Sequence, residues 1–187
     1  MTEVKSSISL LWLGLIAAAG VAAYSFSRTA KAALNLDYRI TKFQIYNVVK
    51  NGNLVLRVQI LFINREASNI VVNNIDLSAY LNSIYTRAQD GSIEVQNKGD
   101  YFARLKDDSG FVIAANSDTY QDFYINVSWQ DLGKMLLFNI ADIIRFIANN
   151  NFNEMLNVLL SKPVLVKGDV RAENIKFPIT QVLNITN

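Results

Sequence analysis

The stretch from Leu54 to Phe62 alternates regularly between apolar and mixed positions. Its apolar side chains occupy every second position: Leu54, Leu56, Val58, Ile60 and Phe62. Successive side chains of a β-strand point to opposite faces, so these five share one face, which must be buried. Asn51 and Gly52, just before the strand, tolerate the positive φ of a type I′ hairpin turn. The pattern predicts a central strand over 54–63 that follows a hairpin.

Further strands are predicted on both sides of this one. The first, which begins at Leu34, changes the phase of its apolar positions near Phe43, which indicates a bulge or a switch between sheets. Asp90-Gly91 predicts another turn. Later alternating runs cover 70–79, 83–88, 92–96, 110–116 and 118–129, and 164–170 and 175–179 come last. The six or seven short strands before residue 130, with turns between them, predict a mainly β fold, an antiparallel β-sandwich.

Between Gln130 and Lys162 the apolar residues recur every three or four positions, which is the period of a helix. Asparagines at 149–151 interrupt the pattern, so we predict a helical pair over 130–161, before the last strands. This pair either covers an open end of the sandwich or offers apolar surface to a partner or to lipid. We favour burial, because monomeric domains seldom expose large apolar patches. The candidate interaction residues are Phe138, Ile140 and Phe146.

An uncharged apolar segment, residues 6–27, lies near the start of the chain between Lys5 and Arg28. A helix needs about 20 mostly apolar residues to cross a hydrocarbon core of about 30 Å, and this segment is long enough. We therefore predict a transmembrane helix and short linker over 1–33, ahead of a sandwich domain over 34–187. The predicted anchor residues, which would contact the lipid bilayer, are Leu10, Leu11, Trp12, Leu13, Leu15, Ile16, Val21 and Tyr24.

Two other interpretations of this segment stay open. Ala30-Lys31-Ala32 resembles a signal-peptide cleavage site, and the helix could instead pack inside a protein assembly. The orientation of the helix in the membrane also stays open, because Lys5 lies on one flank and Arg28 and Lys31 lie on the other. The positive-inside rule slightly favours a cytoplasmic position for the flank with Arg28 and Lys31.

The residue types that are absent limit the chemistry. The chain has no histidine and no cysteine, which excludes disulfides, thiolate metal sites and histidine-dependent catalysis. The adjacent carboxylates Asp107 and Asp108 lie in a predicted turn and do not form the opposed pair of a glycosidase. Phosphate-binding and calcium-binding loop motifs are also absent. We expect no enzyme activity, metal, cofactor or small-molecule substrate.

The net charge of +2 is too small to indicate nucleic-acid binding. The nearest basic and aromatic cluster, residues 98–106, contains Asp100 and is followed by Asp107 and Asp108. These acids neutralise the cluster, so we interpret it as a solvated loop and expect no nucleic-acid partner.

The order of the segments resembles the late-embryogenesis-abundant type 2 (LEA2) family, also called the WHy domain, over roughly residues 34–180. In that family a long alternating strand runs into an Asn, and an I-x-V-x-x-I strand and a Tyr follow. The matching residues are Ile60, Phe62, Asn64, Ile70, Val72, Ile75 and Tyr80. Arg65 stands where the family commonly has Pro, and the helical region is longer than the family's single helix. The resemblance implies an immunoglobulin-like or fibronectin-III-like sandwich without known catalytic residues.

These expectations lead to two hypotheses about function. The first is a non-enzymatic, single-pass membrane-anchored sandwich that acts in binding, envelope protection or assembly. The alternative is a structural subunit of a larger particle, such as a virion or a secretion-type assembly, in which the N-terminal helix packs against protein or an internal membrane. Both imply protein partners or self-association.

Overall fold

The computed structural model describes residues 28, 30–49, 53–136, 140–149 and 153–186. This part of the chain is mainly β, with ten strands and three short helices. The strands are β1 (Asp37–Val49), β2 (Asn53–Asn64), β3 (Ile70–Leu81), β4 (Ile84–Arg87), β5 (Ile93–Asn97), β6 (Asp100–Asp107), β7 (Phe111–Ile113), β8 (Ser117–Ser128), β9 (Pro163–Ala172) and β10 (Ile175–Asn184). The helices α2 (Trp129–Met135), α3 (Ile140–Ala148) and α4 (Asn153–Leu160) lie between β8 and β9.

The predicted central strand is confirmed. β2 lies between β1 and β8 in an antiparallel three-stranded sheet, and the five alternating side chains from Leu54 to Phe62 are all buried. The predicted turn at Asn51-Gly52 lies outside the described residues. The phase change in β1 is confirmed as two register shifts, between Ile40 and Lys42 and between Ile45 and Asn47.

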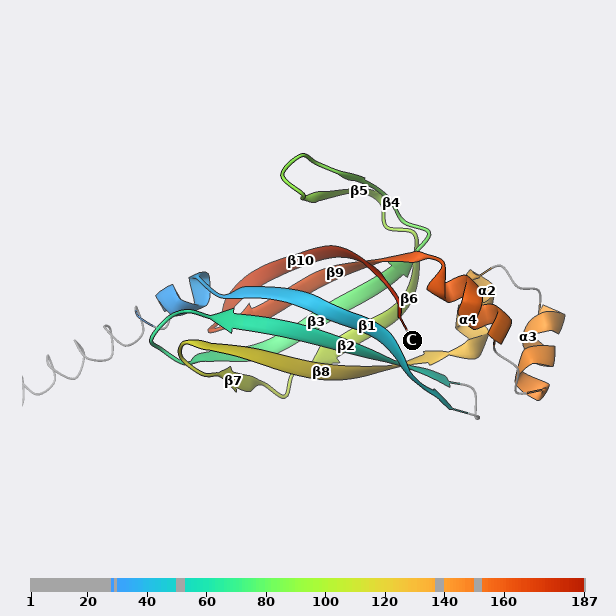
Figure 1. Ribbon diagram of the computed structural model, residues 1–187, viewed down its shortest axis with the longest axis horizontal. Coiled ribbons are helices and arrows are strands. Elements are labelled where there is room, and N and C mark those ends of the chain that lie inside the picture. Colours follow the sequence, from blue (N-terminus) through green and yellow to red (C-terminus); the bar gives the residue numbers. More distant parts are fainter. Residues whose placement is uncertain (1–27, 29, 50–52, 137–139, 150–152, 187) are drawn as a thin grey trace, which may run out of the picture.

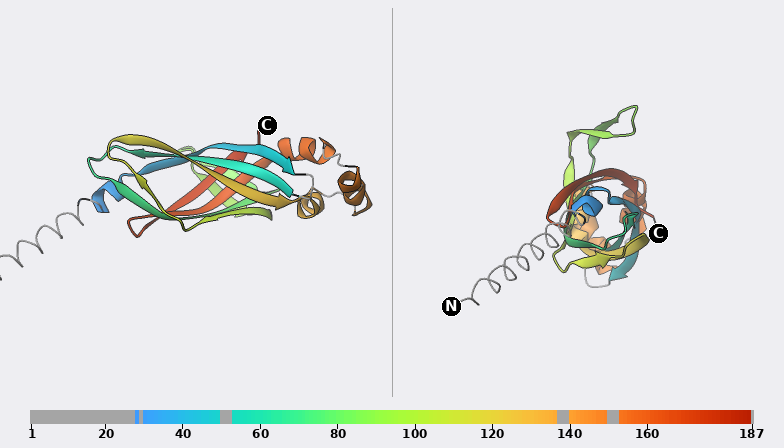
Figure 2. Two further views of the ribbon diagram at one scale, coloured as in Figure 1. Left: turned by 90° about the horizontal axis from the view of Figure 1, so that it is seen from below. Right: turned by 90° about the vertical axis from the view of Figure 1, so that its left-hand side faces the viewer.

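A second antiparallel sheet has the order β10-β9-β3-β6, and β7 pairs with the start of β3. The two sheets stack face to face (Figures 1 and 2), and their inward side chains form one core. Ring contacts join the layers: Phe43 meets Phe102 edge-on at a centroid distance of 6.4 Å, and Phe62 meets Phe111 at 5.3 Å. The alternation of the strands therefore builds a sandwich-like arrangement.

The strand β6 corrects the interpretation of residues 98–106 as a loop. Phe102, Ala103 and Leu105 are buried, and β6 pairs with β3 from Ile75 to Leu81. A register shift after Ala79 places the neighbours Phe102 and Ala103 both toward the core. The irregularity hides the alternation, which is why no strand was predicted here.

The first and last strands close one side of the sandwich without a regular ladder. The side-chain amide of Gln181 donates to the carbonyl oxygen of Ile40 at 3.1 Å and accepts from the Ile40 amide at 3.2 Å. Beyond the bulge, Thr186 accepts from the Ile45 amide at 2.8 Å and donates to the Phe43 carbonyl at 3.0 Å. These contacts satisfy backbone groups on the edge of β1 that β2 cannot reach.

Residues 30–34 form a helical turn, not the start of the first strand. Leu34 is 65 % exposed, whereas Ala32 and Ala33 are buried in the core. Asn35 donates to the Glu66 carboxylate at 2.6 Å, which fastens the turn to the loop after β2. In the part of the chain that the structure describes, no helix has the length and apolar character needed to span a bilayer.

The predicted helical pair over 130–161 is three helices. α2 and α3 pack closely: a Cβ added to Gly133 would lie 2.7 Å from Cγ1 of Ile143. Residues ten positions apart in one continuous helix would lie about 15 Å apart along its axis, so this contact excludes a continuous helix. The three helices cover the end of the sandwich opposite the turn at residues 30–34 (Figures 1 and 2). Their apolar side contributes these buried residues: Trp129, Leu132, Leu136, Ile143, Met155 and Leu159.

The antiparallel pair β4–β5 projects from the body as a separate arm (Figure 1). The turn Asp90-Gly91 is confirmed at its tip, where the Gly91 amide donates to the Ala88 carbonyl at 3.0 Å. Ile84, at the base of the arm, is 55 % exposed. Among the described strands, β4 and β5 pair only with each other, so neither outer edge of the arm is part of a ladder with another described strand.

Gly168 allows β9 and β3 to approach closely, and its replacement gives a test of the sheet. A Cβ at this position would lie 2.0 Å from the carbonyl oxygen of Asp76 and 2.8 Å from Cα of Leu77. Because these are backbone atoms, Gly168→Ala should destabilise the protein by about 3 kcal/mol. The control is Gly91→Ala: no atom lies within 4 Å, so only the positive φ of 84° opposes it, at about 1 kcal/mol. Chemical denaturation measures both; equal losses would contradict the packing at Gly168.

Candidate interaction surfaces

The predicted site residues fall mostly outside the described part of the chain. This holds for the anchor residues Leu10, Leu11, Trp12, Leu13, Leu15, Ile16, Val21 and Tyr24, and for Phe138. Ile140 and Phe146 belong to α3, but their side chains are not described. On the same helix Ile143 is buried and Ile144 is 61 % exposed. The described residues of the helical segment thus support its predicted role in covering the sandwich, and the proposed interaction surface on it remains a prediction.

The outer face of the three-stranded sheet carries an aromatic and polar surface that the sequence analysis missed. Tyr120, Asp122 and Tyr124 alternate along β8 on the side opposite the buried Phe123 and Ile125. Tyr120, Tyr124 and Tyr46 are 60 %, 52 % and 57 % exposed. We call this surface the tyrosine face, defined by Arg39, Lys42, Tyr46, Arg57, Gln59, Tyr120, Asp122 and Tyr124.

Strand register arranges the tyrosine face in three rows across β8, β2 and β1. The first row aligns Tyr120, Leu61 and Arg39; the second aligns Asp122, Gln59 and Lys42; the third aligns Tyr124, Arg57 and Gln44. Tyr46, at the second register shift of β1, meets the Tyr124 ring edge-on at 4.7 Å. Leu61 is only 3 % exposed although it points outward, because Tyr120 and Arg39 on either side of it cover it.

A hydrogen-bonded network occupies the centre of this face. Asp122 accepts from the Arg57 guanidinium at 2.5 Å and from the Gln59 amide at 3.0 Å. Thr41 donates to the side-chain oxygen of Gln59 at 3.1 Å. The hydrogen bond from Arg57 is the main cause that lowers the pKa of Asp122, so this carboxylate is ionised at neutral pH. The network fixes the side chains between the two tyrosines of β8.

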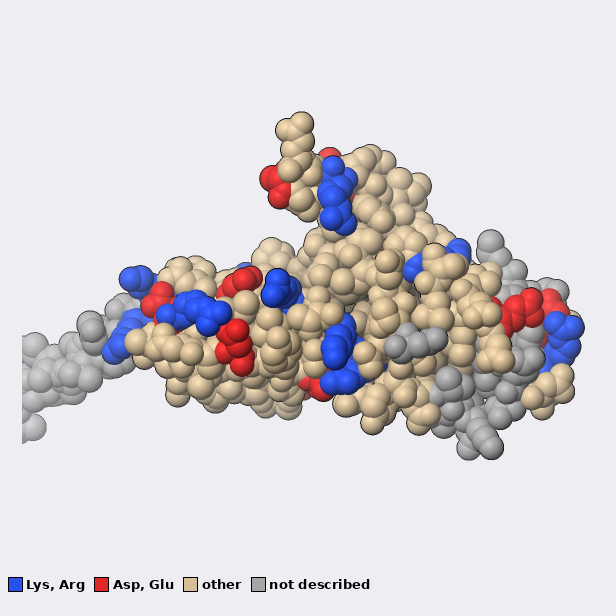
Figure 3. All heavy atoms as spheres, viewed as in Figure 1, with Lys and Arg blue, Asp and Glu red and all other residues tan. Residues whose placement is uncertain are grey.

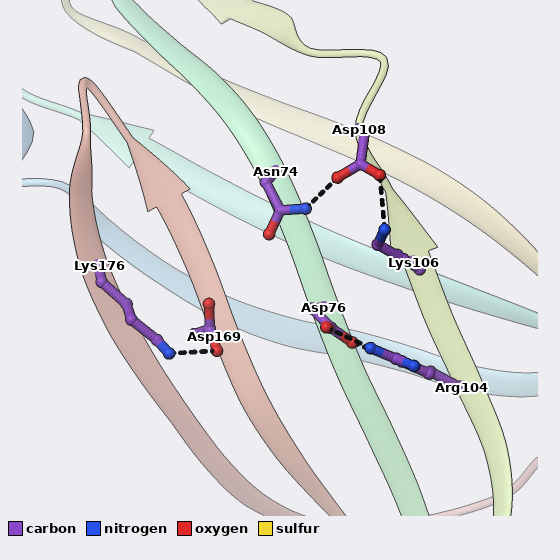
Figure 4. Close-up of polar contacts among 7 residues, drawn as sticks. All are labelled: Asn74, Asp76, Arg104, Lys106, Asp108, Asp169 and Lys176. Atoms are coloured by element: carbon purple, nitrogen blue, oxygen red, sulfur yellow. Dashed lines mark hydrogen bonds and ion pairs between the residues drawn. The ribbon is translucent and has the colours of Figure 1, made fainter.

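The outer face of the five-stranded sheet carries charged residues instead. Figure 4 shows some of them: Asp76 of β3 points to Arg104 of β6, and Asp169 of β9 points to Lys176 of β10. Figure 3 shows the opposite side of the molecule, with β1 and β2 toward the viewer, where acidic and basic side chains also lie close to one another. The Arg104 guanidinium donates two hydrogen bonds to Asp76, at 2.8 and 2.6 Å, and Lys176 lies 3.1 Å from Asp169.

These outer cations offset an unfavourable pairing inside the sheet. Asp76 and Asp169 lie directly opposite each other on β3 and β9, and like charges at such positions repel. Hydrogen bonding by Arg104 is the main cause that lowers the pKa of Asp76. Asp108, at the end of β6, contacts Lys106 at 3.0 Å and accepts from Asn74, and both contacts lower its pKa (Figure 4).

The described residues contain no cluster of three or more carboxylates that could hold a metal ion. The Asp107–Asp108 pair does not form an opposed acid–base pair in the described structure: Asp107 accepts from the Ser109 amide at 3.0 Å in the turn, and Asp108 takes part in the contacts above.

A cleft of about 390 Å³ opens between β1 and β10. The Tyr38 hydroxyl donates to the Pro178 carbonyl across it at 2.8 Å. These contacts are structural.

The sequence did contain a signal for the tyrosine face. In the segment 118–129 the apolar residues Phe123, Ile125 and Val127 predict the buried side of a strand. The same alternation places Tyr120, Asp122 and Tyr124 on the opposite side. Their closeness to Arg57 and Gln59 could not be predicted, because it depends on the pairing of β8 with β2.

The pH dependence of stability tests the ion pair of Asp76. A carboxyl group with a lowered folded pKa adds stability above its ordinary pKa of 3.8, and this stability is lost as the pH falls through the folded value. Asp76→Asn should cost about 1 kcal/mol at pH 7, since the pair is partly exposed, and the difference from the wild type should shrink below pH 4. The control is Asp118→Asn, in a more exposed pair with Arg65, which should change little. Denaturant titrations at several pH values measure this; a constant difference would contradict it.

Comparisons with known proteins leave the chain without an assigned family. No family model matches it, and no curated protein matches its sequence. Among solved structures, a protein from Archaeoglobus fulgidus is similar over 80 % of this chain and 90 % of its own, with 12 % identity and a TM-score of 0.43. Spo0M, a sporulation control protein from Bacillus subtilis, is similar over 81 % of this chain and 49 % of its own, with 11 % identity and a TM-score of 0.38.

A β-glucuronidase from glycoside hydrolase family 2 is similar over 80 % of this chain but only 11 % of its own, with 10 % identity and a TM-score of 0.36. At these values none of the three likenesses assigns a family, a fold type or an activity to this chain.

Proposed function

We propose that this protein is a non-enzymatic, membrane-anchored sandwich of the LEA2 or WHy kind that acts by binding other molecules. In this proposal residues 6–27 cross the bilayer and the strands form an immunoglobulin-like or fibronectin-III-like domain beside it.

The observation that carries this proposal is the junction between the apolar segment and the sandwich. Ala32 and Ala33 are packed into the core only a few residues after the uncharged segment ends. The hydrogen bond between Asn35 and Glu66 fastens the same turn. An anchor that leads into such a turn would hold the sandwich by one end, with the three helices at the far end (Figure 1).

The role of Asn64 supports the resemblance to the LEA2 family on which this proposal draws. Its side-chain amide donates to the carbonyls of Ser68 and Ala114, at 2.8 and 2.9 Å, and its oxygen accepts from the Glu66 amide at 3.0 Å. This residue is 1 % exposed, so it organises the turn after β2 from within. The turn thus has a structural reason to keep Asn at this position, even with Arg65 in place of the family's Pro.

The anchor can be tested by deletion and by a single charge. Removal of residues 1–27 keeps the packed turn at Ala32 and Ala33, so the variant should fold and leave the membrane fraction. Leu15→Arg, in the middle of the segment, should reduce membrane insertion, because a central Arg costs about 3 kcal/mol; Leu15→Ile is the matched control. Flotation with liposomes and carbonate extraction measure association, and circular dichroism verifies the β fold. Full-length protein that stays soluble without detergent or lipid would overturn the anchor.

A role as a subunit of a larger assembly is the second candidate, and the projecting β4–β5 arm favours it. A two-stranded hairpin is at best marginally stable in water without further packing. Free strand edges also pair readily with other chains. An arm of this kind on an otherwise closed sandwich is suited to contact a neighbouring subunit.

Shortening the arm tests this candidate. Replacing residues 85–96 by a short Gly-Ser turn should leave the stability of the sandwich nearly unchanged, because β4 and β5 share no ladder with either main sheet. If the arm joins subunits, native material solubilised in detergent should contain a high-order complex of the wild type. The shortened variant should form only smaller species, and light scattering measures the difference. Ile84→Ser is a milder version. A monomeric wild type, or a complex that survives the deletion, would contradict the assembly role of the arm.

A further inference from the structure

The tyrosine face combines aromatic rings, a rigid hydrogen-bonding centre and an excess of positive charge. Tyr120 and Tyr124 lie four residues apart on one side of β8, which separates them by about 13 Å along the strand. Asp122 lies between them and is held by Arg57 and Gln59. The two tyrosine rings can therefore each contact a flat, weakly polar group of a ligand, and the side chain of Asp122 offers polar atoms at a fixed position between them.

Sugar rings match the aromatic part of this surface. The face of an aromatic ring carries partial negative charge, so it attracts the C–H groups on the apolar side of a pyranose. The exposed sheet face of the OB-fold, another β architecture, binds oligosaccharides. An extended polysaccharide could place one sugar on Tyr120 and another, further along the chain, on Tyr124.

The central carboxylate distinguishes a sugar from a nucleic acid. A carboxylate has about four acceptor sites, and Arg57 and Gln59 use two of those on Asp122. The remaining sites can accept from sugar hydroxyls. A DNA phosphodiester backbone has no donor to offer to these sites.

Charge indicates which polysaccharide fits. The three rows contain Arg39, Lys42 and Arg57 against Asp122 alone, three positive charges and one negative, so their net charge is +2. Arg57 is paired, whereas Arg39 and Lys42 are exposed and have no ion pair to any described residue. The next row, Asp37, Ile63 and Asp118, is acidic, which limits the positive region to these rows. A second copy of the same face would be repelled.

We propose that the tyrosine face binds an acidic polysaccharide, with sugar rings on Tyr120 and Tyr124 and carboxylate or sulfate groups at Arg39 and Lys42. The inference deepens the binding role proposed above and does not depend on the anchor. Full-length protein that binds the polysaccharide but does not associate with membranes would overturn the anchor alone. Protein that associates with membranes but does not bind the polysaccharide would overturn the ligand alone.

The test uses the full-length chain in neutral detergent, immobilised for surface plasmon resonance, with sodium alginate and heparin as carboxylated and sulfated probes. Tyr120→Ala and Tyr124→Ala together should weaken binding at least about ten-fold, since each ring contact contributes up to about one power of ten in affinity. The matched control is Tyr101→Ala: this tyrosine is 54 % exposed on the other sheet and should not alter binding. Thermal unfolding should be nearly the same for all variants, because the replaced rings are mostly exposed.

Charge variants and competitors complete the test. Arg39→Gln with Lys42→Gln should weaken binding to both probes and reduce its dependence on salt; Lys98→Gln with Lys162→Gln, away from this face, is the control. Neutral dextran and oligothymidylate should bind more weakly than alginate or heparin. The proposal is overturned by unchanged binding of the double tyrosine variant, by stronger binding of oligothymidylate, by absence of binding to either acidic probe, or by self-association through this face.

Discussion

Burial of the inward side of β2 and β8 is the constraint on which the rest of the structure depends. β2 is the central strand of its sheet, and its five alternating apolar residues meet the inward side of the other sheet. Because a strand has two sides, fixing one side in the core also fixes what the other side presents to solvent. A slip of one residue in β8 would exchange Phe123 with Asp122 and bury the carboxylate. The same forces that hold the sandwich together therefore position the tyrosine face.

Predictions from the sequence were correct where the local pattern of residues determines the structure. The strand at 54–63, the phase change near Phe43 and the turn at Gly91 are examples in which local pattern and final structure agree. Predictions failed where tertiary contacts override the pattern. β6 was missed because a register shift directs two adjacent residues, Phe102 and Ala103, to the core, and the helical pair became three helices because Gly133 lets Ile143 pack against α2.

The candidate surface shows the same limit. Tyr120, Asp122 and Tyr124 could be assigned to one side of a strand from the sequence, but their neighbours Arg57, Arg39 and Lys42 come from strands 60 or more positions earlier. Only the pairing of β8 with β2, and of β2 with β1, brings them together. The outer face of the other sheet is built by similar pairing, and there Asp76, Asp108 and Asp169 each have a cationic partner.

The contacts of Gln181 and Thr186 with β1 have a consequence for how the protein is made. They join the first strand of the sandwich to residues at its very end, about the greatest sequence separation the domain allows. Contacts of this kind form late, because the intervening chain must lose most of its conformational freedom first. During synthesis β1 therefore has an uncovered edge until residues 181–186 have left the ribosome. A nascent chain whose apolar N-terminal segment had already reached a membrane would pass this vulnerable stage tethered to the bilayer.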